Sequence, residues 1–218
     1  MGFLLDNCHF DRLTSEIINQ CQPYKCSKDS GIDSFFHMDN DDNFQDYHEE
    51  MMSNSHCFYT DNENPQMVCA FSLASSALRI DTLAKNKRKE FNKQNDIPFA
   101  KRRSQYPAIL ISQLCIFDGF GRKAFGYDIG DEMMDLIKTM VMDPENDNAA
   151  RFLVVDAINT PEVIGYYQRN GFEFLFASDE DELIGLRGYN PVEFIENEES
   201  PRCRTRLMFF DLLVLREP

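Results

Sequence analysis

Two neighbouring tyrosines, Tyr166 and Tyr167, lie near the end of a helical pattern in "RFLVVDAINTPEVIGYYQRNGFEFL", residues 151–175. A phenol with a pKa near 10 can act as a general acid. This stretch supports two interpretations: an ordinary strand–helix–strand unit, or the wall of a site in which one tyrosine donates a proton. Consecutive helical residues point about 100° apart, so the two side chains cannot both face the same site.

A second candidate site is the glycine-rich segment 117–130, "FDGFGRKAFGYDIG", between an apolar run and a helical pattern. Backbone N–H groups and the positive end of the following helix make such a turn suitable for an anion. Its glycines stand at 119, 121, 126 and 130, which matches neither the Walker A spacing nor Gly-x-Gly-x-x-Gly. The segment therefore predicts an anion site outside these two phosphate motifs.

The elements around these residues follow from local patterns. "AILISQLCI" (108–116) predicts a strand buried on both faces, and "DEMMDLIKTMVM" predicts an amphipathic helix. "RFLVVDAI" predicts a second buried strand, followed by a helix with Thr160 as N-cap and Pro161 in its first turn, ended by Asn170-Gly171. "FEFLF" and "TRLMFFDLLVL" predict the last two strands.

The N-terminal half is less regular. "SHCFYT" and "MVCAFSL" flank a turn-rich linker and predict a β-hairpin, and the acidic stretch "GIDSFFHMDNDDNFQDYHEEMM" predicts one or two helices. Residues 1–30 are not placed by any pattern. Hairpins that flank alternating strands and helices predict an α/β (α+β) fold with a mixed central sheet and helices on both faces, in one domain over residues 1–218.

Charge is unevenly distributed. Segment Lys85–Arg103 holds eight Lys/Arg against two carboxylates, so it carries +6, and the rest of a chain with net charge −15 carries −21. This acidity argues against a general nucleic-acid binder. The basic segment is interpreted as a solvated, mobile loop, with a local anionic partner as the alternative.

Composition indicates a reduced, non-membrane location. The seven cysteines are an odd number and several lie in strand-like runs, which predicts buried free thiols in a cytoplasmic protein. No apolar run approaches the ~18 residues of a membrane-spanning helix, and the N-terminus lacks a signal-peptide pattern. "CQPYKC" has no partner pair downstream, so no metal site is expected.

Several segments, in their order and spacing, resemble the GNAT superfamily of acetyl-CoA-dependent N-acetyltransferases. They are "YPAILISQLCI", the loop ending "GYDIGDEMMDLI", "RFLVVDAIN", "YYQRNGFEFL" and "TRLMFFDL". The resemblance is strongest over residues 106–175, where the acetyl-CoA-binding core would lie. "KCSKDSGIDSFF" is similar to the start of bacterial GNAT proteins of the toxin branch. The resemblance implies a GNAT fold and acetyl transfer from acetyl-CoA, as a cosubstrate, to a primary amine without a metal.

The resemblance also implies a site. Tyr167 would be the general acid that protonates the CoA thiolate. The cofactor would be bound by three segments. These are the strand end with Leu114, Cys115 and Ile116, the pyrophosphate loop and its cations with Arg122, Lys123, Gly126, Tyr127, Ile129, Gly130 and Asp131, and the asparagine after the next strand, Asn159. Phe125 and Asp128 depart from the family's loop, where Arg or Gln and Gly are usual. These departures lead to the alternative hypothesis, a catalytically degenerate GNAT-fold protein that acts as an interaction or regulatory module.

Partners follow from the resemblance and the charge together. Aminoacyl-tRNA is one candidate acceptor, with segment Lys85–Arg103 positioning its phosphates. A peptide or a small amine is an equal alternative. The sequence leaves open the general base, a homodimer and an antitoxin partner.

Overall fold

The computed structural model describes residues 2–38, 41–97, 104–143, 145, 149–188 and 202–216. They form two compact units. The first comprises Met1–Ser75 and Leu110–Asp143, and the second comprises Ser76–Ile109 and Pro144–Pro218. That the whole chain is one domain stays a prediction.

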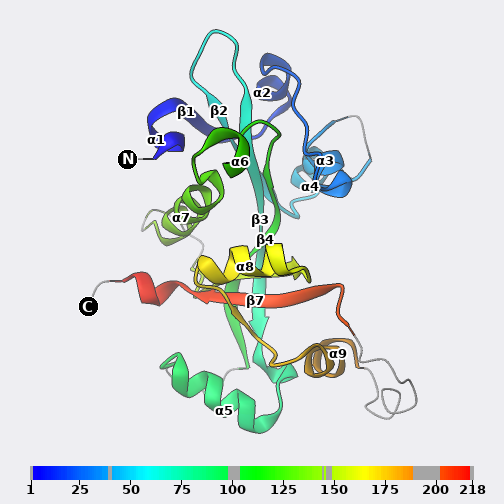
Figure 1. Ribbon diagram of the computed structural model, residues 1–218. Helices are drawn as coiled ribbons and strands as arrows, with labels where there is room; N and C mark the ends of the chain where they lie inside the picture. The colour runs from blue at the N-terminus through cyan, green and yellow to red at the C-terminus, as the bar shows by residue number, and fades with distance from the viewer. Residues whose placement is uncertain are drawn as a thin grey trace. The chain divides into compact units, whose positions relative to one another are not determined.

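The first unit contains the N-terminal elements and the glycine-rich segment (Figure 1). Its helices are α1 (Phe3–Asn7), α2 (Ser15–Gln20), α3 (Ser30–Phe35), α4 (Phe44–Glu49), α6 (Arg122–Phe125) and α7 (Ile129–Met142). Its strands are β1 (Cys8–Arg12), β2 (Asn54–Thr60) and the parts of β3 (Met67–Arg79) and β4 (Gln105–Ile116) that fall within the unit. Two acidic helices, the β2–β3 hairpin and the helix after the glycine-rich segment are thereby confirmed.

The second unit contains 3-10 helix η1 (Ile80–Thr82), α5 (Lys85–Gln94), β5 (Phe152–Ile158), α8 (Pro161–Arg169), β6 (Glu173–Phe174), α9 (Asp179–Arg187), β7 (Thr205–Asp211) and η3 (Leu212–Leu215). Thr160 caps α8 as expected, since its hydroxyl accepts a hydrogen bond from the Val163 N–H at 3.4 Å. Pro161 occupies the first turn, and the helix ends before Gly171 at φ +81°. Local sequence alone therefore set both ends of α8.

The strands follow the order β1-β2-β3-β4-β5-β7-β6 in one mixed sheet. β1 pairs antiparallel with β2, and β2 with β3. β5 and β6 each pair antiparallel with β7, so the closing strand lies between them. The predicted α/β class with a mixed sheet is confirmed.

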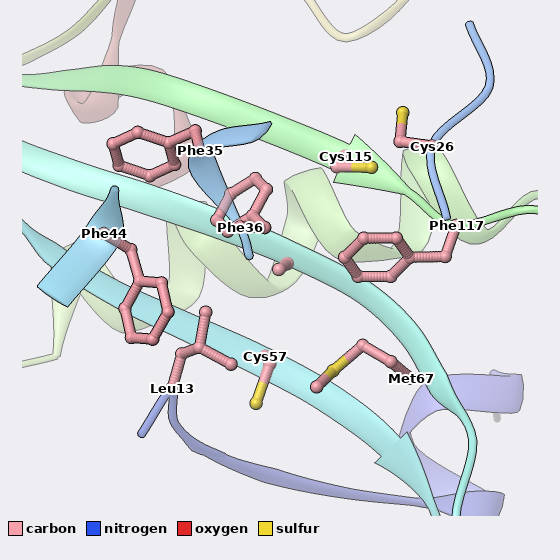
Figure 2. Packing of buried hydrophobic residues seen from close by; sticks show 10 residues of the cluster. Leu13, Cys26, Phe35, Phe36, Phe44, Cys57, Met67, Cys115 and Phe117 are labelled. Carbon is pink, nitrogen blue, oxygen red and sulfur yellow. The ribbon is translucent and has the colours of Figure 1, made fainter. Parts of the chain in front are cut away.

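Phenylalanines from the acidic helices build the core of the first unit. Phe35 and Phe44, with Phe36 directly after α3, are buried against residues of the strands (Figure 2). Among their partners are Cys57 of β2 and Cys115 of β4. An acidic, phenylalanine-containing segment thus serves the core through its apolar positions, while its carboxylates cap helices, as Asp46 does in the capping box with Asn43.

Two expectations are corrected. Residues 85–94 form helix α5 and not a loop, because Phe91 is buried and Arg88 donates to the carbonyls of the preceding turn. β4 is not buried on both faces: residues 112–114 and 116 are only half-buried. Its buried positions also change parity, from Tyr106 and Ala108 in the second unit to Ile111 and Cys115 in the first. One apolar run therefore contributes buried residues to both units.

The turn after α8 provides a stability prediction. A Cβ at Gly171 would have φ +81° and would meet the Phe210 ring at 2.9 Å. We expect Gly171→Ala to lower the free energy of unfolding by about 1–3 kcal/mol. Gly165→Ala is the matched control within α8, where a Cβ meets nothing within 4 Å. It should stabilise by about 0.5–1 kcal/mol. Urea unfolding measures both, and equal effects would contradict the left-handed turn.

Candidate functional site

The glycine-rich segment forms a short helix, a left-handed turn and the start of a long helix, all in the first unit. α6 ends at Gly126, which has φ +84°. Asp128 is the N-cap of α7, whose first residues are Ile129, Gly130 and Asp131. The positive end of the α7 dipole therefore lies at residues 128–131, where the predicted pyrophosphate loop falls. A 14-residue helix provides a full-strength dipole end for an anion there.

Asp128 fits the loop conformationally but adds charge to it. Its φ is −93°, so the backbone does not require glycine at this position. Its carboxylate lies 3.0 Å from the Arg122 guanidinium, in an exposed ion pair. Because Arg122 already neutralises Asp128, an incoming anion would compete with Asp128 for this cation. The side chain of the second predicted cation, Lys123, lies outside the described part of the molecule.

Phe125 lies in an aromatic cluster that also holds the N-terminal helix. Its ring meets Phe3 at 4.6 Å, Phe120 at 5.2 Å and Tyr127 at 5.4 Å between centroids. The residue that replaces the family's Arg or Gln is therefore a packing residue. Tyr127 is more than half exposed at the edge of this cluster.

The structure reveals a role for Glu132 that local sequence did not predict. Its carboxylate accepts hydrogen bonds from the Leu4 and Leu5 N–H groups, at 2.9 and 3.3 Å. Glu132 thus caps α1 as well as lying in the first turn of α7, and α1 packs on α7 (Figure 1). Helix α1, from the N-terminal segment that no pattern placed, thereby packs on the helix that begins at the candidate loop. A partner 128 residues away leaves no local signal.

The predicted strand end shows which groups could serve a ligand. The Cys115 side chain is buried in the core with Cys26, whereas Leu114 and Ile116 are half-buried. A hydrogen bond to Cys26 and burial raise the pKa of Cys115, and the same hydrogen bond lowers the pKa of Cys26 to about 7. The Cys115 side chain is therefore committed to the core and does not face a ligand.

Tyr167 lies on α8 in the second unit and is 7% exposed. Its ring packs edge-on against Tyr166 at 5.1 Å and Phe172 at 5.3 Å. Burial raises the pKa of Tyr167. Within the described residues, the Tyr167 hydroxyl makes no hydrogen bond. A protonated phenol of this kind can donate to a ligand without first breaking a bond within the protein.

Asn159 follows β5 and is fixed by three hydrogen bonds in the second unit. Its backbone N–H donates to the Arg204 carbonyl at 3.0 Å. Its side-chain amide donates to Asp179 Oδ2 and to the Cys203 carbonyl, both at 2.9 Å. The candidate residues thus form two groups, one around the α7 N-terminus and one of Asn159 and Tyr167.

In the described part of the basic segment, residues 85–97, two of the five cations are engaged within the protein. Arg88 donates to the carbonyls of Ile80, Asp81 and Leu83, and Lys87 pairs with Glu90 at 3.1 Å. Lys85, Lys89 and Lys93 are exposed on α5. Residues 98–103 lie outside the described residues. α5 therefore offers three exposed lysines to an anionic partner besides the paired Lys87.

The described part of the chain has few features of a further site. No group of three or more His, Cys, Asp or Glu side chains is placed there to hold a metal ion. None of its helices combines the length and apolar character that crossing a membrane requires. All seven cysteines are free thiols, five of them buried, as predicted.

Comparison with known proteins places the fold. No protein-family model and no curated protein matches the sequence. Among solved structures, a tyrosine-to-phenylalanine mutant of KacT matches with a TM-score of 0.59 at 12% identity, over 96% of this chain and 97% of that chain. AtaT complexed with acetyl-methionyl-tRNA matches at 0.58 and 13%, over 95% and 96%. AtaTR bound with acetyl-CoA matches at 0.57 and 15%, over 96% of each chain.

These neighbours are toxin-type GNAT proteins, so the chain has the GNAT fold that its motifs predicted. The match covers nearly the whole length of both partners and includes the N-terminal region. At 12–15% identity the likeness concerns the fold, and what the site does must be argued from its residues.

Proposed function

We propose that this protein is an acetyl-CoA-dependent N-acetyltransferase that transfers the acetyl group directly to a primary amine, with Tyr167 as the general acid. The observation that carries the proposal is the buried Tyr167, whose hydroxyl has no hydrogen-bond partner among the described residues, on the helix where the GNAT resemblance puts the acid. Solved structures of the same fold with acetyl-CoA and with acetyl-methionyl-tRNA support it.

The chemistry requires little from the protein beyond positioning. The amine nitrogen attacks the thioester carbonyl, the C–S bond breaks, and the thiolate takes the proton of the Tyr167 hydroxyl. The nitrogen loses its proton to water, which then restores the phenol. Holding the two reactants together supplies much of the acceleration. The buried phenol, with its raised pKa, stays protonated until the thiolate forms.

Binding of the cofactor would fall to the loop and to Asn159. The N-terminus of α7 would face the pyrophosphate, with backbone N–H groups from residues 126–131 as donors. Arg122 would leave Asp128 for a phosphate. Leu114, Cys115 and Ile116 would contribute backbone groups to the pantetheine arm.

For the acceptor, we propose the amino group of an aminoacyl-tRNA. Exposed Lys85, Lys89 and Lys93 on α5 offer phosphate contacts that depend on charge and not on base sequence. Binding through three such contacts would be salt-dependent, with a log–log slope of about −2 to −3. A peptide or small amine is the alternative acceptor, and it would show no such slope. Action on tRNA would place the protein in the cytoplasm.

A second candidate function is an interaction module without catalysis. Two observations favour it. Arg122 already pairs with Asp128 and is therefore less available for a phosphate, and Phe125 packs in an aromatic cluster where the family has a polar Arg or Gln. In this case the loop would not bind acetyl-CoA with useful affinity.

Calorimetric titration with acetyl-CoA separates the two functions. We expect saturable binding by the natural chain, and severalfold tighter binding by Asp128→Asn, which removes a carboxylate from the loop and releases Arg122. Asp135→Asn is the control. It also removes an exposed carboxylate from α7, but it does so more than one helical turn beyond the loop. Binding by Asp128→Asn alone would favour the interaction module. Binding by neither protein would contradict the enzyme.

A further inference from the structure

Asp179 holds the side chain of Asn159 in one orientation. The two groups within hydrogen-bond distance of the Asn159 amide are a carboxylate oxygen, Asp179 Oδ2, and a carbonyl oxygen of Cys203, each at 2.9 Å. Both are acceptors, so the nitrogen of the amide must lie on this side. Both N–H bonds of the amide are thereby used.

The oxygen of Asn159 is consequently the group left for a ligand. Within the described residues, Asn159 Oδ1 accepts no hydrogen bond, and the residue is half-buried. An amide in this state offers an acceptor and no donor. It therefore selects an N–H or O–H group of a ligand and disfavours a carbonyl or a phosphate oxygen at the same place.

Asp179 is itself fixed on both oxygens. Its Oδ2 also accepts from the Cys203 N–H at 2.8 Å, and its Oδ1 accepts from Arg206 Nη1 at 2.6 Å. Arg206 in turn donates to Glu182 at 2.7 Å and to the Phe176 carbonyl at 2.9 Å, and it is 6% exposed. A carboxylate held by three donors has no alternative rotamer that keeps all three bonds.

We propose that Asp179 is a positioning residue that fixes Asn159 with its amide oxygen toward the ligand, as an acceptor for an amide N–H of the pantetheine arm of acetyl-CoA. This inference rests on the proposed function. In this proposal, helix α9 orients a side chain that binds the cofactor. α9 lies outside the segments that resemble the family's cofactor motifs.

The substitution Asp179→Asn tests the orientation. Its single oxygen is drawn to the Arg206 guanidinium, so its NH2 group faces the nitrogen of Asn159 and the Cys203 N–H. Two facing donors cannot bond, so the Asn159 NH2 group keeps only the Cys203 carbonyl as an acceptor, and the amide is displaced from the orientation that presents its oxygen. The ligand N–H would then lose its acceptor, and we expect about tenfold weaker acetyl-CoA binding or more.

The experiment measures the Kd of the full chain and its variants for acetyl-CoA and, separately, for adenosine bisphosphate, the nucleotide half of the cofactor. Asp179→Asn should weaken acetyl-CoA binding and leave nucleotide binding unchanged. Glu182→Gln is the matched control: it removes a carboxylate from the same cluster without contacting Asn159. We expect it to lower the melting temperature and leave both Kd values unchanged.

Three results would contradict the inference. Unchanged acetyl-CoA binding by Asp179→Asn would overturn it while the proposed function stands. Equal weakening for the nucleotide half, or equal weakening by Glu182→Gln, would mean a general structural effect and would also overturn it. If the natural chain binds neither ligand, the proposed function fails, and this inference fails with it.

Discussion

Tyr167→Phe is expected to lower kcat for acetyl transfer by roughly 10²–10⁴-fold. The substitution removes only the hydroxyl, and the ring contacts with Tyr166 and Phe172 remain. Because the hydroxyl has no partner within the described protein, its loss leaves no buried group unsatisfied. Stability and the Kd for acetyl-CoA should therefore stay near their natural values, and the loss should fall on the chemical step.

Tyr166→Phe is the matched control. It removes the same hydroxyl from the neighbouring position, which is half-buried and points about 100° away around α8. We expect little change in kcat. A comparable loss in both variants, or an unchanged kcat in Tyr167→Phe, would contradict Tyr167 as the acid. Single-turnover rates at saturating acetyl-CoA are the measurement, because they isolate chemistry from binding and release.

Burial of Tyr167 also predicts a pH profile. Because burial raises the pKa of Tyr167, the phenol stays protonated beyond pH ~10, where a free tyrosine ionises. The kcat profile should therefore have no falling limb from this residue below about pH 10. A falling limb near pH 8 that vanishes in Tyr167→Phe would contradict this assignment. The same raised pKa stabilises the fold below the unfolded pKa of about 10, and that contribution is lost as the pH rises further.

Arg206→Met should give the largest loss of stability, about 3–5 kcal/mol in the free energy of unfolding. Arg206 pairs with Glu182 at 2.7 Å and Asp179 at 2.6 Å, and its guanidinium lies 4.4 Å from the centre of the Phe174 ring. Methionine keeps much of the apolar volume but leaves the buried Glu182 without its cation. For a chain of this length, the thermal midpoint should fall by roughly 10 °C.

The loss should depend on pH with a defined sign. Burial already raises the pKa of Glu182, and the hydrogen bond from Arg206 opposes that rise. Without Arg206 the folded pKa rises further above the unfolded value, so Glu182 stabilises the fold only while protonated. The destabilisation should therefore be largest near pH 7–8 and smaller near pH 4–5. Unfolding curves at both pH values measure it.

Lys87→Met is the control for this prediction. Lys87 pairs with Glu90 at 3.1 Å, but both side chains are more than half exposed. An exposed pair contributes little, so the thermal midpoint should barely change. If both variants lower the thermal midpoint equally, the ion pairs of Arg206 with Asp179 and Glu182 do not stabilise the fold as a buried network.

Local sequence determined the elements that surround the site. The Thr160 cap, Pro161 in the first turn and the Asn170-Gly171 ending specify α8 from residues within one turn of each end, and the structure reproduces all of them. The order of strands and helices likewise sufficed to predict the mixed sheet, and the resemblance of several segments to the GNAT superfamily implied the GNAT fold. Such signals succeed because caps and apolar periodicity act over a few residues.

The basic segment shows where composition misleads. Its charge indicated a solvated loop, whereas residues 85–94 are helical, since Phe91 is buried in the second unit and Arg88 binds three carbonyls of the turn before it. A single buried aromatic residue among lysines is a weak local signal. What stabilised the helix was a tertiary contact.

Tertiary structure alone decided how the candidate site is held. Glu132 caps α1 across 128 residues, Arg206 binds Asp179 across 27, and the Asn159 amide is oriented by Asp179 across 20. Hydrogen bonds and ion pairs act at about 3 Å and are indifferent to separation along the chain. Residue types can therefore indicate that an asparagine and a tyrosine could serve acetyl transfer, but only the packed chain determines which groups restrain them and which atoms they leave for a ligand.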